Sequence, residues 1–245
     1  MYFIGNLPDS GIGIAAVGLT ESFVAVIYTF AIGISTGATA IIARRIGEKN
    51  HDTASQTSAQ VILLTSILVV FISIFGVVYA SDILKLVGAQ QEVVEAGTIY
   101  TQIILGSSVS IVYLFILNGI FRGAGDSSMA MKSLWLALGI NILLDPLLIY
   151  GYGPIPAYGI KGGAIATVIG RSVGVLYQCY YLFGNSKIIR LNRTHFKWNT
   201  PIVKTIMKLS GPATLQNFVP TGSFLVIVYL VALSGSTEAV AGHQV

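Results

Sequence analysis

The stretch NILLDPLLIYGYG, Asn141–Gly153, places a carboxylic acid in a run that otherwise consists of leucine, isoleucine, proline, asparagine, tyrosine and glycine. Asp145 is followed directly by Pro146. An acid at the centre of a membrane-spanning helix costs roughly 2.5–3.5 kcal/mol on insertion scales, so it normally faces a protein interior and marks an ion or proton path. The interpretation of Asp145 therefore depends on whether the apolar runs of the chain are membrane spans.

The composition indicates that they are. Hydrophobic residues make up 54% of the 245 positions and charged residues only 10%. A soluble domain has about 25% charged residues, so this chain cannot cover its surface with polar groups in water. The net charge of +4 comes from bases gathered between apolar runs, which is typical of membrane topology and not of nucleic-acid binding. The single Cys179 excludes an internal disulfide framework and argues against a cysteine metal site.

Six apolar segments approach the roughly 20 residues that a helix needs to cross a hydrocarbon core of about 30 Å. They must be helices, because an open sheet would leave backbone groups unpaired in lipid. The predicted spans are residues 12–43, 58–80, 96–119, 133–151, 162–183 and 210–233. We expect an all-α membrane protein, a polytopic helical bundle. Its first and last residues are similar to parts of further helices, as in a piece of a longer protein.

The basic residues predict the orientation. Eleven of the 14 Lys and Arg residues follow the first, third and fifth spans. The positive-inside rule therefore places three loops in the cytoplasm, residues 44–57, 120–132 and 184–208. Within the spans, three G-x-x-x-G spacings predict close helix packing, namely Gly33 with Gly37, Gly119 with Gly123, and Gly170 with Gly174.

A cation site is predicted around Asp145. Asn141 precedes it by four residues, so both side chains lie on one helix face. Pro146 removes a backbone donor, which frees carbonyl oxygens near Ile142 and allows the helix to bend. With the hydroxyl of Thr167, these hard oxygen donors suit a proton or an alkali cation such as Na⁺. The alternatives are that Asp145 caps a surface loop and that Thr167 bonds its own backbone.

Other polar residues in or near the spans have two interpretations each. Tyr100 and Tyr113 offer aromatic faces to organic cations, but tyrosine is also common at membrane interfaces. Arg171 is either a charge in a cavity or a side chain that reaches toward a surface, and Glu21 is expected at the outer end of its span. The sequence contains no H-E-x-x-H, P-loop or G-x-S-x-G motif, so we expect no enzyme.

Several motifs together resemble the multidrug and toxic compound extrusion (MATE) family, in the order and spacing of that family. They are AAVGLT (15–20), GISTGATAIIARRIGEKN (33–50), FRGAGD (121–126), NILLDPLLIYG (141–151), GIKGGAIATVIGR (159–171) and KLSGPA (208–213). The resemblance implies a V-shaped transporter of twelve helices in two lobes, of which this chain supplies the end of helix one, helices two to seven and the beginning of helix eight. It implies a first-lobe bundle at residues 1–185, a basic cytoplasmic linker at 186–208 and the start of the second lobe at 209–245.

The resemblance also implies functional residues. Asn141, Asp145 and Thr167 match the family's cation site, Tyr100 is a plausible match for a nearby tyrosine, and the acid expected on helix one would precede Met1. A glutamate that some members carry on helix seven is replaced by Pro220. The polar residues nearest to that position, Gln216 and Asn217, are candidates to line a substrate cavity with Tyr113 and Arg171.

The expected function is secondary active antiport, the export of cationic or amphipathic drugs and toxic solutes in exchange for Na⁺ or H⁺. The expected partners are the lipid bilayer, a small-molecule substrate and the remaining second lobe, with no cofactor beyond the coupling ion. One alternative is a lipid-linked oligosaccharide flippase of the same superfamily, although Arg171 is the only cavity cation to hold a pyrophosphate. The other is a non-transporting membrane scaffold in which Asp145 pairs with Arg171.

Overall fold

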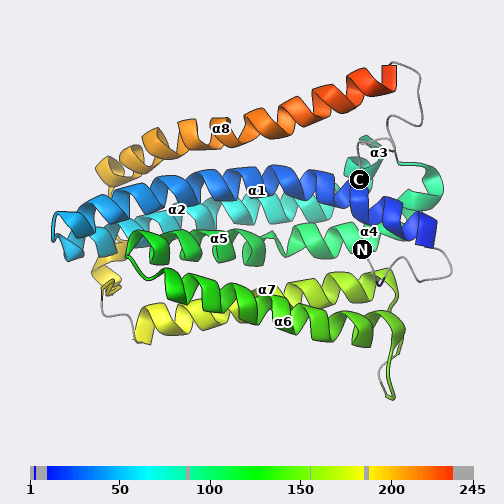
Figure 1. Cartoon of the computed structure of the whole chain (residues 1–245), viewed down its shortest axis with the longest axis horizontal. Helices are drawn as coiled ribbons and strands as arrows, with labels where there is room; N and C mark the ends of the chain where they lie inside the picture. Colours follow the sequence, from blue (N-terminus) through cyan, green and yellow to red (C-terminus); the bar gives the residue numbers. More distant parts are fainter. Residues whose placement is uncertain (1–2, 4–9, 87–88, 155, 185–187, 234–245) are drawn as a thin grey trace.

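The computed structural model describes residue 3 and residues 10–86, 89–154, 156–184 and 188–233. Its elements follow in chain order: α1 (Ser10–Gly47), α2 (His51–Val78), α3 (Ala80–Leu86), α4 (Gln91–Gly106), α5 (Ser108–Gly123), α6 (Ser127–Tyr150), α7 (Ile160–Gly184), the 3₁₀ helix η2 (Arg193–Phe196) and α8 (Thr200–Leu233). The described residues thus form the predicted all-α bundle (Figure 1). The expected beginning of a further helix, at residues 234–245, lies outside the described residues.

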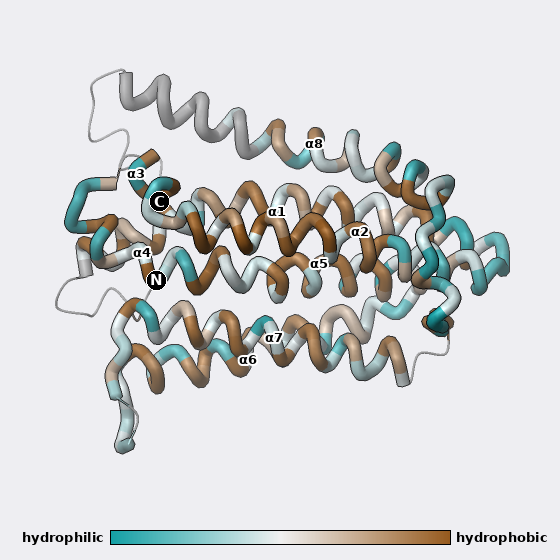
Figure 2. The backbone as a smooth tube through the Cα atoms, turned by 180° about the vertical axis from the view of Figure 1, so that it is seen from behind, coloured by the Kyte–Doolittle hydropathy of each residue, from teal (hydrophilic) through white to brown (hydrophobic). Residues whose placement is uncertain are grey.

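Each of the six predicted spans corresponds to a long helix or to a pair of helices in line. Within the described residues, four segments are long and apolar enough to cross a membrane: Gly11–Gly47, His51–Val78, Gln91–Gly123 and Ser127–Tyr150. Hydrophobic residues follow the helices through the middle of the bundle, and hydrophilic residues gather at its two ends (Figure 2). The other two spans, α7 and α8, have 25 and 34 residues, and their crossing stays a prediction.

The third predicted span is broken into α4 and α5 at Ser107. The hydroxyls of Ser107 and Ser108 donate to the carbonyls of Ile104 and Leu105, three residues earlier, at 3.0 and 2.6 Å. Serine hydroxyls that bond the preceding turn compete with the backbone ladder and bend helices. The break is therefore a local effect of the serines that follow Gly106.

Helix α8 begins at Thr200, inside the segment that the sequence assigned to a linker. The side chain of Asn199 accepts a hydrogen bond from the backbone N–H of Ile202 at 3.4 Å, which satisfies a free donor of the first turn. Pro201 fits that turn because a backbone N–H has no helical acceptor there. The polar residues before the apolar run are thus helical as well.

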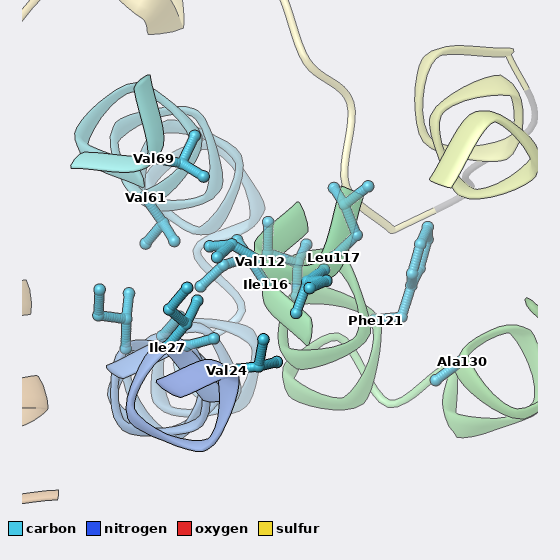
Figure 3. Packing of buried hydrophobic residues seen from close by; sticks show 14 of the residues in the cluster. Val24, Ile27, Val61, Val69, Val112, Ile116, Leu117, Phe121 and Ala130 are labelled. Atoms are coloured by element: carbon cyan, nitrogen blue, oxygen red, sulfur yellow. The ribbon is translucent and has the colours of Figure 1, made fainter. Parts of the chain in front are cut away.

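The helices form a layered bundle around α1 (Figure 1). Helix α1 packs against α2, α4, α5 and α8, while α6 and α7 form a hairpin that joins the others through α4 and α5. Helix α8 lies on the opposite side of α1 from that hairpin (Figure 1). In the core, Val24 and Ile27 of α1, Val61 of α2, and Val112 and Ile116 of α5 point toward one another (Figure 3).

Glycine pairs bring the helices together, as the sequence predicted. A Cβ atom added to Gly33 would lie 2.6 Å from the Cα of Thr214 on α8. One added to Gly119 would lie 2.8 Å from the carbonyl oxygen of Ser35 on α1. Real Cβ atoms do not approach other atoms so closely, and the second glycine of each pair contacts the same partner helix. The predictions for these two pairs are confirmed.

The segment between α7 and α8 is fastened to α2. The Gln60 side chain donates to the carbonyls of His195 and Lys197 at 2.9 and 2.8 Å, and its oxygen accepts from the N–H of Asn199 at 3.0 Å. His195 Nε2 lies 3.1 Å from Oδ1 of Asp52. This end of the bundle also holds the α1–α2 and α5–α6 turns (Figure 1), so the three basic loops lie at one end. That arrangement is what the positive-inside prediction requires.

Candidate ion and substrate site

Three predicted polar side chains meet between α6 and α7. The Nδ2 atom of Asn141 lies 3.3 Å from Oδ1 of Asp145, one turn further along α6. The same atom lies 3.2 Å from Oγ1 of Thr167 on α7. All three side chains are partly buried. The structure therefore brings together the amide, the carboxylate and the hydroxyl that the sequence assigned to a cation site.

A glycine allows this convergence. A Cβ atom on Gly170 of α7 would lie 2.7 Å from the carbonyl oxygen of Ala137 and 3.2 Å from the Cβ of Asn141. The bare glycine backbone lets α7 approach α6 at the level of Asn141. Together with Gly174, whose added Cβ would lie 3.0 Å from that of Ala137, this confirms the third predicted glycine pair.

The arrangement suits a small hard cation after one local change. As placed, the Asn141 amide donates its hydrogens to Asp145 and Thr167. Rotation of the terminal amide exchanges the positions of Nδ2 and Oδ1. The carboxylate, the amide oxygen and the hydroxyl would then face a common point, and all three are oxygen ligands of the kind that alkali and alkaline-earth ions prefer.

Helix α6 runs without interruption through Pro146, from Ser127 to Tyr150. Proline has no N–H, so the carbonyl of Ile142, one turn earlier, lacks its helical donor. This oxygen lies in the same turn as Asn141, close to the cation site. The helix bend at Pro146 stays a prediction.

Tyr100 is buried on α4, with 5% of its surface exposed. Its helix, α4, packs against α1 and α7, the helices that carry Glu21 and Thr167. Among the described residues its hydroxyl makes no hydrogen bond to the three side chains of the cation site. Its predicted role in cation coupling stays a prediction.

Arg171 lies one turn beyond Thr167 and reaches across to α1. Its Nη2 atom donates a hydrogen bond to the Tyr28 hydroxyl at 2.7 Å, and its guanidinium carbon lies 5.9 Å from the centre of that ring. Two neighbouring hollows share Arg171. The first, of about 410 Å³, we call the aromatic hollow, and it is lined by Tyr28, Ile32, Ile111, Leu114, Phe115 and Arg171. The second, of about 260 Å³, we call the polar hollow, and it is lined by Glu21, Leu114, Leu134, Ala137, Leu138, Asn141, Thr167 and Arg171.

Three of the four predicted cavity residues lie elsewhere. The Tyr113 hydroxyl pairs with that of Ser66 on α2. Successive helical residues are turned by about 100°, so Tyr113 faces α2 while the next residue, Leu114, faces both hollows. Gln216 and Asn217 belong to α8, which lies across α1 from the α6–α7 hairpin (Figure 1). Of these four predicted residues, Arg171 is the one that lines the two hollows as the structure describes them.

Sequence reasoning missed the role of Tyr28. It lies seven residues after Glu21 on α1, two helical turns further along the same face, and this spacing was the available signal. It also missed a buried cluster between α5, α6 and α7. There Gln178 Nε2 donates to Asn118 Oδ1 at 2.9 Å and lies 2.8 Å from Ser133 Oγ. Polar residues inside three predicted spans were the signal for that cluster.

Charges outside the membrane-spanning segments are arranged conventionally. Hydrogen bonds from Arg44 and then Arg45 lower the pKa of the Glu48 carboxyl just beyond the end of α1.

Within the described residues, no group of three or more His, Cys, Asp and Glu side chains is placed to hold a metal ion. A cation at Asp145 would therefore depend on amide and hydroxyl oxygens as well as on the carboxylate.

Comparison with known proteins supports the resemblance seen in the motifs. The chain is 27% identical over 236 residues to the probable multidrug resistance protein YoeA of Bacillus subtilis. The aligned part is 94% of this chain and 51% of the relative. A crystal structure of MATE in the bent conformation matches 98% of this chain and 52% of its own, with 30% identity and a TM-score of 0.88. The inward-facing structure of a multidrug resistance MATE family transporter matches with 30% identity and a TM-score of 0.81, over 93% of this chain and 51% of its own.

The chain thus spans about half the length of the curated relatives that it matches. The MatE family model matches residues 1–147, which is more than half of the chain. With its long apolar helices, this all-α chain is a multi-pass protein of the cell membrane and belongs to the MatE family.

Proposed function

We propose that this chain forms the first lobe and the first helix of the second lobe of a secondary active antiporter. The transporter exports cationic or amphipathic drugs and toxic solutes in exchange for Na⁺ or H⁺. The observation that carries the proposal is the convergence of Asn141, Asp145 and Thr167 between α6 and α7. The names of its relatives, which include multidrug resistance proteins, support the substrate class.

The cation site borders the space in which a solute would bind. Asn141 and Thr167 both line the polar hollow, which also contains Glu21 and Arg171. A charged carboxylate away from water is costly unless a proton or a cation neutralises it. Binding of the ion at Asp145 therefore changes the charge and the hydrogen bonds of the wall that a solute contacts.

Coupling follows from this shared wall. An ion shifts a conformational equilibrium only by its difference in affinity between the two states. When external Na⁺ or H⁺ binds at Asp145, the Asn141 amide turns or releases its two acceptors, and the α6–α7 contact changes. We propose that this change favours the state that releases the solute outward, with Pro146 as the bending point of α6.

The loops 44–57, 120–132 and 184–208 face the cytoplasm, and residues 186–208 connect the two lobes. Alternating access requires the remaining second lobe to rock against this one. Transport is therefore a property of the complete transporter that contains this chain.

The scaffold alternative required a bridge between Asp145 and Arg171. In the part of the chain that the structure describes, Asp145 is bonded to Asn141 and Arg171 to Tyr28, and the two charges form no ion pair. No specific observation favours this alternative. The flippase alternative is separated from the exporter by the substrate assay below.

The test is efflux of a fluorescent cationic dye from liposomes that contain the complete transporter. We expect efflux under an imposed Na⁺ or H⁺ gradient, and its loss in Asp145→Asn, which keeps the shape of the side chain but cannot ionise. Asp82→Asn is the matched control, because Asp82 is an exposed acid that pairs with Lys85 on α3 at 3.9 Å. Undiminished gradient-driven efflux in Asp145→Asn would refute the proposed coupling role. No dye movement in the folded wild type under either gradient would favour the flippase.

A further inference from the structure

Arg171 carries a positive charge inside the bundle and forms no ion pair with a carboxylate among the described residues. Its hydrogen bond, among those that the structure describes, goes to the neutral phenol of Tyr28 at 2.7 Å. The ion pairs in the described ranges join Arg44 and Arg45 to Glu48, Lys85 to Asp82, and His195 to Asp52. A guanidinium has five N–H donors, so the hydrogen bond to Tyr28 uses only a small part of the donor capacity of Arg171.

The surroundings of Arg171 are those of a binding site. It lines both the aromatic and the polar hollow, which also share Leu114. The summed volume of the two hollows falls within the roughly 300–1,000 Å³ that is typical of small-molecule sites. A few placed polar groups in a mainly apolar cleft are typical of such sites.

An aromatic wall lies next to the guanidinium. The rings of Tyr28 and Phe115 make an edge-to-face contact with centroids 5.4 Å apart, and both residues line the aromatic hollow. Such rings bind aromatic solutes by stacking and edge contacts. The hydrogen bond to Tyr28 holds Arg171 against this wall, so its position is fixed before a solute arrives.

The polar hollow adds a charge of the opposite sign. Glu21 lines it together with Arg171, and the two residues do not form an ion pair in the described structure. A site with a separated acid and base is complementary to a solute that carries both charges. A solute with two negative groups would meet repulsion from Glu21.

We propose that Arg171 binds the carboxylate of the exported solute, and that the transporter prefers aromatic zwitterions over aromatic cations. The planar guanidinium presents paired N–H groups that match the two oxygens of a carboxylate. The ring of the solute lies along Tyr28 and Phe115, and its cationic group is directed toward Glu21. This inference rests on the proposed export function and specifies its substrate class.

The probes are two rhodamine dyes with the same xanthylium ring, one with a free carboxylate and the other its methyl ester. Their affinities for the purified complete transporter are measured by fluorescence anisotropy. We expect the wild type to bind the acid more tightly than the ester. In Arg171→Gln the affinity for the acid falls by about tenfold or more, while that for the ester is unchanged or higher.

Two further variants protect the test against a folding defect. Arg171→Lys keeps the charge without the planar fork, and we expect it to keep part of the preference for the acid. Arg193→Gln removes an exposed arginine of η2 and leaves both affinities unchanged. Retained affinity for the ester shows that each variant is folded. Equal losses for both dyes, or an unchanged preference in Arg171→Gln, would overturn the proposal.

The same dyes separate this inference from the proposed function. Gradient-driven efflux of the ester together with no preference for the acid contradicts the role of Arg171 and leaves the antiporter intact. A preference for the acid that depends on Arg171, together with no gradient-driven efflux of either dye, contradicts the antiporter and supports the binding site.

Discussion

The amide nitrogen of Asn141 lies 3.2 Å from the hydroxyl oxygen of Thr167, although 26 residues separate the two in the chain. This contact joins α6 to α7 at the level of the predicted coupling acid, Asp145. A hydroxyl at this point has two consequences, because it holds the amide in place and offers an oxygen to a cation.

Replacement of Thr167 by valine removes this oxygen at nearly constant volume. We expect the affinity for the coupling ion to fall by about 10- to 100-fold, as is typical when a group that orients or supplies a ligand is lost. The measurement is the ion concentration for half-maximal dye efflux by the complete transporter. Thr36→Val is the control, because the hydroxyl of Thr36 donates only to the carbonyl of Ile32 in its own helix, at 2.8 Å. Equal half-maximal concentrations for Thr167→Val and the wild type would contradict the prediction.

The close approach of α6 and α7 predicts that Gly170 tolerates no side chain. In Gly170→Ala the added methyl would lie 2.7 Å from the carbonyl oxygen of Ala137, so the helices must separate. We expect a loss of about 1–3 kcal/mol in the free energy of unfolding, measured by chemical unfolding in micelles. Gly139→Ala on α6 is the control, since nothing lies within 4 Å of its added Cβ. The control should be neutral or stabilising by up to about 1 kcal/mol, and a similar result for Gly170→Ala would show that the helices are not closely packed there.

The helices could be predicted because the length of each apolar run is read directly from the sequence. Their exact ends depended on single side chains instead. Asn199 caps α8 eleven residues before the predicted span, and the third span is broken in its middle, next to Ser107 and Ser108. Such local hydrogen bonds do not change the hydropathy pattern, so the pattern cannot locate them.

The candidate site was predictable where its residues share one helix. Asn141 and Asp145 are one turn apart, and this spacing alone places both on one face. The contact of Arg171 with Tyr28 joins residues 143 positions apart and depends on how α7 and α1 pack. The position of Tyr113 outside the two hollows has the same cause, because the rotation of α5 about its axis decides which residue faces them.

The hydrogen bonds of Gln60 predict how the basic segment between α7 and α8 is held. Gln60→Ala removes the two hydrogen bonds that the Gln60 amide donates to the carbonyls of His195 and Lys197. It also removes the oxygen that accepts from the Asn199 N–H. Each such bond contributes about 0.5–1.5 kcal/mol, so exchange of the Asn199 amide hydrogen should accelerate by tenfold or more. Hydrogen exchange with mass spectrometry measures it. Gln91→Ala, which loses an exposed contact with Glu95, should leave the Asn199 amide unaffected. Unchanged exchange in Gln60→Ala would show that the segment is held by other contacts.

The buried cluster of Gln178, Asn118 and Ser133 predicts a coupled loss of stability. Gln178→Leu removes the donor that lies 2.9 Å from Asn118 Oδ1 and leaves that buried oxygen only the longer contact with Ser133 Oγ, at 3.4 Å, among the described residues. We expect a loss of about 1–2 kcal/mol in the free energy of unfolding. The double variant Gln178→Leu with Asn118→Leu removes both partners and should lose less than the sum of the single losses.

Chemical unfolding in micelles measures all three variants of the cluster. Gln102→Leu is the matched control, because the Gln102 side chain makes only a long hydrogen bond of 3.4 Å, to the carbonyl of Val77. Its loss should be below about 0.5 kcal/mol. Additive losses for Gln178 and Asn118 would mean that the two side chains stabilise the bundle independently. A smaller loss in the double variant would instead establish their hydrogen bond as one of the contacts that hold α5 and α7 together.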